Sequence, residues 1–466
     1  MKNLTLQSGL SKEIFNVSQK FHHYLSKPQQ RNFREIMRGM ILTGSVFLNQ
    51  IAEVNSKEIT DRKNTERLSK TLSKIDINNF HRIHINSQIK KYQHESVLIF
   101  ADGGDLQKPH AKKMEMICKN IDGSNGHKVG KGYPIFSLLA YGTSSQKMTP
   151  LAQHLWSTKE ENYKSDWCEH QKIFIQLDNL VQSSCYDRII IEDRGCDDIK
   201  RFNYFLNNLN CSFITRISAG NKSRNLITKY INKEDNQEKI EINKINVNKE
   251  ENEIISVKDL AKKIKSNAKN QKKWKNKKLG KILTSSIAFQ KVYLPELKDK
   301  ENKTLPLYAI LIFTKGFNEP MVLLTDLKIS DYETAWKYFF YYKKRWEIEN
   351  FFRAEKQNFN AEKFLIRGFK KIKALILILM LVFSFLLELK QKIKQFLSGL
   401  YQGFLQFCKK KKKTAKHHLD LLAFLRDCLA DVYSDFSYRF CSRKISKYRS
   451  VRNKDQIKLI DFRKKW

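Results

Sequence analysis

A sixteen-residue stretch, YYKKRWEIENFFRAEK at 341–356, combines acidic, basic and aromatic residues at spacings that suit chemistry. If this stretch is helical, an advance of about 100° per residue brings four polar side chains within an arc of about 60°: Tyr342, Arg345, Glu349 and Lys356. The other two glutamates of the stretch lie off this face. A carboxylate between two cations on a helix is by itself an ordinary ion-pair stripe. A catalytic role for Glu349 therefore needs partners from elsewhere in the chain.

Two aspartates provide such partners, because each ends a short apolar segment that is predicted as a strand. Asp102 closes LIFAD and Asp193 closes IIIED. An aspartate at a strand end is commonly only a turn or cap residue. However, phosphodiester cleavage needs carboxylates that converge on divalent metals, since the cation activates water and neutralises the phosphate. Asp105, which we expect three residues into the following loop, is the alternative to Asp102, and we prefer Asp102 because it ends the strand directly.

The order of the predicted elements supports this convergence. The predicted order is three strands, a helix, a strand, a helix and a strand. The strands are at 96–102, 133–142, 147–157, 188–193 and 211–218, and the helices are at 166–184 and 198–209. This connectivity predicts an α/β fold with a ribonuclease-H-like core, a mixed five-stranded sheet flanked by helices. In such a sheet the strands that end in Asp102 and Asp193 are neighbours, so both carboxylates can reach one metal.

Changes in composition along the chain predict five regions. They are a basic helical region at 1–90, the first part of the core at 91–218, a β-rich insertion at 219–328, the second part of the core with the Glu349 helix at 329–408, and a basic helical region at 409–466. The run KKKKKTAKHH at 409–418 is predicted as a linker. The apolar run at 374–387 has fourteen residues, fewer than the roughly 18 needed to cross a bilayer. We therefore expect a buried core helix and no association with a membrane.

The charge of the chain indicates a polyanionic partner. Its 466 residues contain 87 Lys and Arg against 48 Asp and Glu, a formal net charge of +39. The basic residues are spread along the whole length, which favours nucleic acid over a membrane surface. A hydrophobic content of 41% is sufficient for a large core and argues against a disordered basic tail. The eight cysteines form no CxxC pair, so neither a zinc finger nor a disulfide framework is predicted.

Together these motifs resemble a known family. The pattern Tyr342-x2-Arg345-x3-Glu349-x6-Lys356 resembles the Tyr-Arg-Glu-Lys signature of a group of bacterial insertion-sequence transposases that have a DDE catalytic triad. The segments DGGDLQKPHAKKME at 102–115 and EDRGCDD at 192–198 resemble the first and second aspartate boxes of that group, and the resemblance extends over about 90–390.

The resemblance implies a metal-binding triad of Asp102, Asp193 and Glu349, separated by 91 and 156 residues, with the β-rich insertion in the longer gap. One departure is Gly104, at a position where many members have a hydroxyl residue.

Further expectations follow from the resemblance. The metal would be Mg²⁺, with Mn²⁺ as a substitute. Tyr342, Arg345 and Lys356 would contact the DNA backbone, since a guanidinium can fork onto a phosphate and an ammonium adds a point charge. The partners would be double-stranded DNA, namely terminal inverted repeats and target DNA, and a second copy of the chain in a homodimer on the DNA. Because the region at 1–90 is helical, basic and outside the catalytic core, it is expected to recognise the element end, the alternative being that it only packs on the core; the chain would act in the cytoplasm and nucleoid of a bacterium.

Two other functions remain open at this stage. A ribonuclease-H-like nuclease or resolvase would share the core but is usually shorter and lacks so large an insertion. A catalytically inactive DNA-binding protein derived from a transposase would keep only end recognition, and an intact triad argues against it. Within the insertion, Trp274 lies in a very basic segment. It is an alternative candidate for stacking on an unpaired base, whereas packing is the simpler interpretation.

Overall fold

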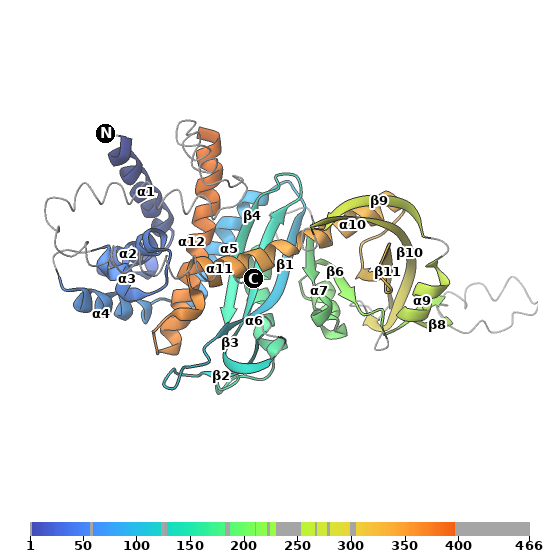
Figure 1. Ribbon diagram of the computed structural model, residues 1–466, viewed down its shortest axis with the longest axis horizontal. Helices are drawn as coiled ribbons and strands as arrows, with labels where there is room; N and C mark the ends of the chain where they lie inside the picture. The colour runs from blue at the N-terminus through green and yellow to red at the C-terminus, as the bar shows by residue number, and fades with distance from the viewer. Residues whose placement is uncertain are drawn as a thin grey trace, which may run out of the picture. The chain divides into compact units, whose positions relative to one another are not determined.

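The chain folds into two compact units (Figure 1). A computed structural model describes residues 2–396 apart from 56–58, 123–125, 127, 182–186, 210, 221–223, 230–252, 266–267, 277–279 and 299–303. The larger unit spans Ile77–Arg353, and the smaller one combines Met1–Asp76 with the residues from Ala354 onward. The basic regions predicted at 409–418 and 419–466 lie outside the described residues.

A large mixed sheet forms the centre of the larger unit. Its strands are β1 (Val97–Gln107), β2 (Cys118–Asp122), β3 (Lys128–Gly142), β4 (Met148–Leu155), β5 (Arg188–Glu192), β6 (Ser212–Ile217), β7 (Asn225–Lys229), β8 (Glu253–Ser256), β9 (Lys269–Asn276), β10 (Lys281–Lys298), β11 (Thr304–Thr314) and β12 (Met321–Thr325). The order is β2-β3-β1-β5-β6-β12-β11-β10-β7-β8, while β4 pairs with β3 and β9 with β10. Strand β1 runs antiparallel to β3 and parallel to β5. This mixed α/β architecture agrees with the fold class predicted from the sequence.

Helices cover one face of this sheet. They include α5 (Ile77–Ile89), η2 (Lys90–Tyr92), α6 (Asp166–Val181), η3 (Arg194–Cys196) and α7 (Ile199–Asn207). Helix α5 packs on α6 and β4, and α7 packs on β6. Because side chains alternate along a strand, every second residue of β1 enters the same core as Phe174 and Phe205: Val97, Ile99 and Ala101. The intervening residues, Asp102 among them, point to the opposite face.

The strands of the insertion belong to the same sheet as the core. Strand β12 pairs antiparallel with β6, with Leu324 opposite Thr215. Strands β10 and β11 form a long antiparallel pair beyond it, and α9 (Val257–Lys263) packs on β8. Helix α10 (Tyr332–Lys344) contacts β10. The insertion is therefore tied to the core by a β-ladder as well as by chain connections.

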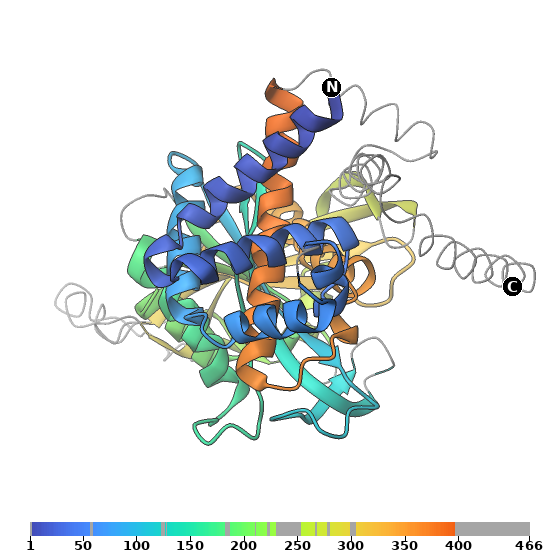
Figure 2. The ribbon, with the colours of Figure 1, turned by 90° about the vertical axis from the view of Figure 1, so that its left-hand side faces the viewer.

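The smaller unit is helical. It contains α1 (Lys2–Gln19), η1 (His22–Tyr24), α2 (Lys27–Thr43), α3 (Leu48–Glu53), α4 (Asp61–Leu72), the end of α11 (Trp346–Asn358), η5 (Ala361–Lys363) and α12 (Phe369–Phe396). A capping box between Ser26 and Gln29 starts α2, and Gly44 ends it in the left-handed conformation with φ 58°. Helix α12 contacts both α2 and α4, and Figure 2 shows it crossing these helices.

Helix α12 corrects one sequence argument. The apolar run at 374–387 is only part of a longer helix, and Phe369–Leu389 is long and apolar enough by length and composition to cross a membrane. Length therefore does not decide its role. Its burial decides the role, because 83% of the most apolar segment of the helix is buried within the structure. This is the behaviour expected of a core helix packed against neighbouring helices.

Candidate active site

Two parallel strands bring the first two carboxylates together. Strands β1 and β5 pair in parallel, with Phe100 opposite Ile191. Continuing this register by two residues sets Asp102 beside Asp193, so the predicted neighbourhood of the two strands is confirmed. Asp193 is the first residue after β5 and adopts an extended conformation, φ −87° and ψ 175°, before the short helix η3.

The prediction that Asp102 ends its strand was wrong. Strand β1 continues through Gly103 and Gly104 to Gln107, held by pairing with β3. Asp105 is thus inside the strand rather than in a loop. It is three residues from Asp102, and an odd spacing along a strand puts two side chains on opposite faces. Asp105 is 7% exposed and faces away from the side that holds Asp102 and Asp193.

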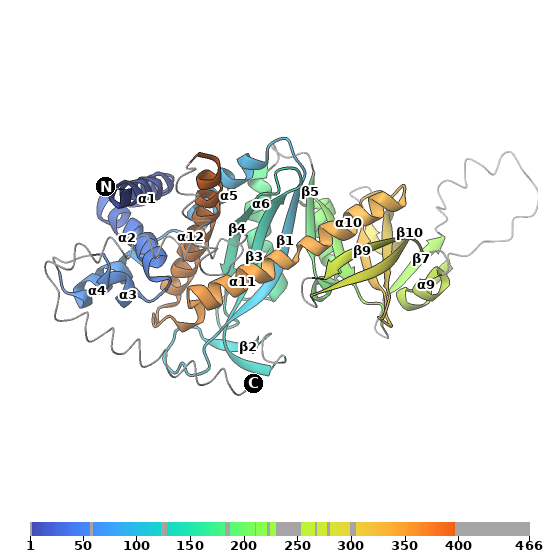
Figure 3. The ribbon, with the colours of Figure 1, turned by 45° about the horizontal axis from the view of Figure 1, so that its top comes forward.

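The third segment is a pair of helices rather than the single helix predicted for 341–356. Helix α10 ends at Lys344 and α11 begins at Trp346, with Arg345 between them. The turn is tightened by bonds between residues three apart, from the Arg345 amide to the Tyr342 carbonyl (3.0 Å) and from the Ile348 amide to the Arg345 carbonyl (2.9 Å). Since Arg345 keeps helical angles, the chain does not reverse. Figure 3 shows α10 and α11 following one another nearly end to end.

Arg345 lies at the centre of the site. Its Nη1 donates to Asp102 Oδ2 at 2.7 Å, and its Nη2 donates to Glu349 Oε1 at 2.8 Å and is 3.3 Å from Asp193 Oδ2. Only 10% of its side chain is exposed. Tyr342 donates its hydroxyl to Asp193 Oδ1 at 2.8 Å. One guanidinium therefore holds three carboxylates that come from three separate parts of the sequence.

Burial and this cation set the protonation of the site. Burial raises the pKa of Asp102 to about 7, against the opposing effect of Arg345, and the charges of Asp193 and Glu349 raise it further. Burial also acts to raise the pKa of Asp193, but Arg345 and the hydrogen bond from Tyr342 outweigh it and leave that pKa below its usual value. Burial and Asp193 raise the pKa of Tyr342. In this arrangement the Tyr342 hydroxyl stays a donor, and Asp102 is easier to protonate than Asp193.

The donor set fits a divalent cation in kind, because three carboxylates supply oxygen ligands around one positive charge. In the described part of the chain, however, no three His, Cys, Asp or Glu side chains form a group that could hold a metal as they stand. The guanidinium of Arg345 occupies the space between the acids. Metal binding by Asp102, Asp193 and Glu349 therefore requires Arg345 to move aside.

A second, fully buried ion pair lies beneath this site, and the sequence analysis missed it. Glu192 is 0% exposed and accepts from Arg201 Nε at 3.0 Å and from its Nη2. Arg201 also contacts His170 Nδ1 at 3.0 Å and lies over the Trp167 ring. The signal was present in the sequence, because Glu192 precedes Asp193 directly and adjacent strand residues face opposite sides. Glu192 thus anchors the end of β5 to α6 and α7 while Asp193 faces the other way.

The remaining sequence candidates have other contacts. Lys356 forms an ion pair with Glu362 at 3.0 Å. Trp274 donates its indole N–H to Ser285 at 3.0 Å, packs edge-on against Phe339, and has the Lys343 ammonium 4.3 Å from its ring centroid. Gly104 lies under Phe352, whose ring would be 3.3 Å from an added Cβ. A hydroxyl residue at Gly104 would be crowded by this contact.

Comparison with known families decides the identity of the chain. A family model described as "Transposase DDE domain" matches residues 93–385, more than half of the chain. The chain belongs to the DDE transposase family. This family normally uses divalent metals, in agreement with the oxygen-rich donor set.

Other comparisons add little to the family assignment of this transposase. No curated protein matches it. Among solved structures it is similar to the crystal structure of the NurA nuclease from Sulfolobus solfataricus, at 12% identity with a TM-score of 0.18, over 58% of this chain and 82% of that one. A TM-score of this size is too low to support any inference.

The buried pair beneath the site predicts a large stability effect in this transposase. Arg201→Ala leaves the Glu192 carboxylate buried without its counter-ion, so we expect the free energy of unfolding to fall by about 3–5 kcal/mol. Lys263→Ala breaks an exposed pair with Glu253 in the same unit and is expected to cost less than about 1 kcal/mol. Urea unfolding followed by circular dichroism measures both. Equal losses in the two variants would contradict this account of the buried pair.

The position of Arg345 predicts that its removal lowers the stability of the protein without metal and increases the stabilisation by added Mn²⁺. In EDTA, Arg345→Ala leaves three neighbouring carboxylates without their shared cation, and we expect the free energy of unfolding to fall by about 2 kcal/mol. Mn²⁺ should then raise the melting temperature of the variant more than that of the wild type, because the acids are open to the ion. Arg353→Ala removes an exposed arginine from α11, the helix that follows Arg345, and serves as the control. A variant as stable as wild type in EDTA, with no added response to Mn²⁺, would show that Arg345 does not hold the acids.

Proposed function

We propose that this DDE transposase binds the ends of an insertion sequence and catalyses metal-dependent strand cleavage and strand transfer, as a member of the group with the Tyr-Arg-Glu-Lys signature. The observation that carries the proposal is the meeting of Asp102, Asp193 and Glu349 around one cation. Three acids of separate origin have no structural need to share a single guanidinium. A site that binds positive charge strongly and alternates between protein and metal cations explains their position.

The sheet supports a ribonuclease-H-like core. Strands β4, β3, β1, β5 and β6 are adjacent in that order. Strand β3 runs antiparallel to both of its neighbours, β4 and β1, whereas β1, β5 and β6 are parallel to one another. This order supports the five-stranded arrangement expected from the sequence for residues 91–218, and we propose these five strands as the catalytic core. The glutamate helix of 329–408 would complete it, and 219–328 would be the insertion.

We assign distinct tasks to the residues of the site. Asp102, Asp193 and Glu349 would hold Mg²⁺ or Mn²⁺, which when bound activates water and neutralises the phosphate. Tyr342 orients Asp193 through its hydrogen bond. Arg345, once released from the acids, is free to fork onto a DNA phosphate. Lys356 would add a second cation for the DNA backbone on leaving Glu362. Hydrolysis of one phosphodiester then exposes a 3′-hydroxyl, which attacks target DNA in the second step.

We further propose that residues 1–90 recognise the terminal inverted repeat and that two copies of the chain act together on DNA in the cytoplasm. Helix α4 supports this role, since its buried side carries Leu68 and Leu72 while Lys63 and Lys70 are exposed. These lysines are seven residues apart and therefore lie on one side of the helix. Such a basic face matches what a helix needs to approach a DNA groove.

The proposal predicts that Glu349→Gln abolishes cleavage of an element-end duplex while leaving its binding intact. Glu349→Gln removes one metal ligand and one negative charge but none of the cations that attract DNA, so we expect binding to persist and the cleavage rate to fall by about a hundredfold or more. Asp102→Asn and Asp193→Asn should behave alike, and EDTA should stop cleavage by the wild type. A nicking assay and a gel-shift assay on the same DNA measure the two properties separately.

Glu347→Gln is the matched control for this test. Glu347 is on the same helix as Glu349 but accepts a hydrogen bond from Asn350 rather than from Arg345. DNA cleavage by the Glu347→Gln variant should therefore remain near the wild-type rate. Equal activity of Glu349→Gln and Glu347→Gln would contradict the triad. Binding without any cleavage by the wild-type chain would instead support a catalytically inactive end-binding protein.

A further inference from the structure

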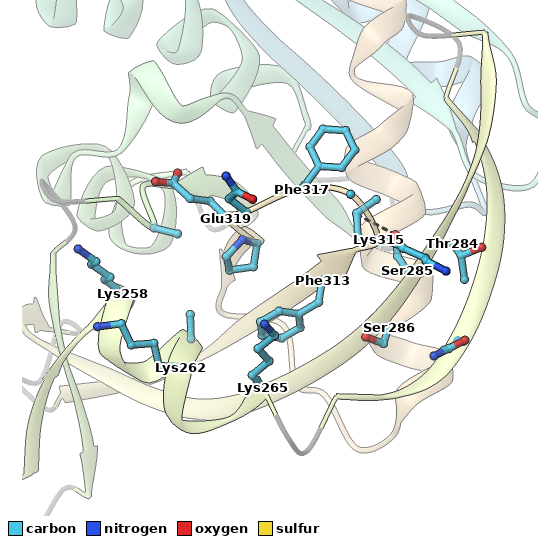
Figure 4. Close-up of a pocket in the computed structure, with 17 residues that line it drawn as sticks. Lys258, Lys262, Lys265, Thr284, Ser285, Ser286, Phe313, Lys315, Phe317 and Glu319 are labelled. Atoms are coloured by element: carbon cyan, nitrogen blue, oxygen red, sulfur yellow. Dashed lines mark hydrogen bonds between the residues drawn. The ribbon is translucent and has the colours of Figure 1, made fainter.

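A basic cavity opens in the insertion, away from the carboxylates. It has a volume of about 670 Å³ and is enclosed by α9, the strands β9, β10 and β11, and the turn between β11 and β12. Figure 4 shows lysines of the α9 segment along one side, hydroxyl residues of β10 along another, and Phe313 between them. Its lysines come from opposite walls: Lys258, Lys262 and Lys265 from the α9 segment and Lys315 from the β11–β12 turn.

The spacing of the lysines on the α9 segment gathers them on one side. Lys258 and Lys262 are four residues apart on α9, which is the spacing of neighbours on a helix surface, and Lys265 follows two residues after the end of α9. Val257, Leu260 and Ala261 of the same helix are buried and fix its orientation. Lys263, in contrast, does not line the cavity and pairs with Glu253 at 2.5 Å. Position on the helix therefore decides which lysines face the cavity.

Little acidic charge balances this cavity. Glu319 is the single acidic residue in its lining, against four lysines. Lys262 pairs with Asp259, a pair with more than half of each side chain exposed, which holds the ammonium only weakly. For Lys265 and Lys315, the described part of the chain provides no ion pair. A concave surface with an excess of cations attracts an anion with several charges.

A second cavity adjoins the first. It has a volume of about 260 Å³ and shares five lining residues with the first: Ala219, Thr314, Phe317, Glu319 and Pro320. Its own cations are Arg194, Arg216 and Lys343. Arg194 directly follows Asp193. Seven cations and one acid therefore line a path of two adjoining cavities, which includes Arg194, the residue after Asp193, and the lysines of the α9 segment and the β11–β12 turn.

We propose that this path binds the phosphates of one DNA strand that continues beyond the scissile position. We call it the phosphate track and define it by Arg194, Arg216, Lys343, Lys265 and Lys315. The proposal rests on DNA as the substrate. A strand with regularly spaced phosphates fits a row of cations longer than a small anion needs. Lysines at its far end contact phosphates without reading bases, so the track binds any sequence.

Replacing one lysine on each wall by uncharged glutamine tests the phosphate track in the full-length chain. The variant Lys265→Gln/Lys315→Gln is compared with Lys263→Gln/Lys281→Gln, which removes equal charge from the same insertion at exposed positions outside the lining. The probe is a random-sequence duplex with a single-stranded tail of roughly 12 nucleotides, a length within the usual range of such sites. Fluorescence anisotropy across a series of salt concentrations gives the affinity.

Loss of two phosphate contacts should reduce the slope of log affinity against log salt by about 2 in the first variant and leave it unchanged in the control. A blunt duplex of the same sequence should show a smaller difference. Identical slopes for wild type and both variants, or equal reductions in both variants, would overturn the track. Because the probe contains no element end, this result is independent of cleavage. A wild-type chain that fails to cleave its element end in Mg²⁺ would contradict the proposed function and leave the slopes to test the track.

Discussion

The arrangement of the active site depends on one guanidinium among three carboxylates. Asp102, Asp193 and Glu349 would repel one another in a partly buried site, and the charge of Arg345 removes that repulsion. The break between α10 and α11 occurs at Arg345 itself. The two helices and the strands that carry Asp102 and Asp193 are thereby joined through a single side chain. The same contacts hold the three acids close together and offset their negative charge.

Alternation along the strands separates the acids into two groups with different tasks. Asp193 faces Arg345, whereas Glu192, its neighbour, faces the helical layer and pairs with Arg201. Asp102 and Asp105 are divided in the same way along β1. The buried pair holds the strand end in place from below, and the exposed side remains available to ligands. A one-residue shift of register would exchange these groups and remove the site.

The sequence predicted those features that depend on local pattern. Apolar runs identified β1, β5, β6 and α12, and the spacing of Arg345 and Glu349 brought them to one side of the chain. It did not predict that β1 continues through Gly103 and Gly104, because glycine disfavours strands and only pairing with β3 holds it there. The break at Arg345 and the Glu192–Arg201 pair were also missed. Each depends on partners distant in sequence, which periodicity does not reveal.

The smaller unit has a consequence for synthesis of the protein. Helices α2 and α4 are made first, yet the helix that they contact, α12, begins only at Phe369. A nascent chain therefore carries the N-terminal helices without their core partner for most of translation, and the closing loop is long. Glu349 also emerges late, after both strands that carry the aspartates. The cluster around Arg345 and the helical unit are thus completed late and close together, so a chain interrupted before Glu349 contains neither in finished form.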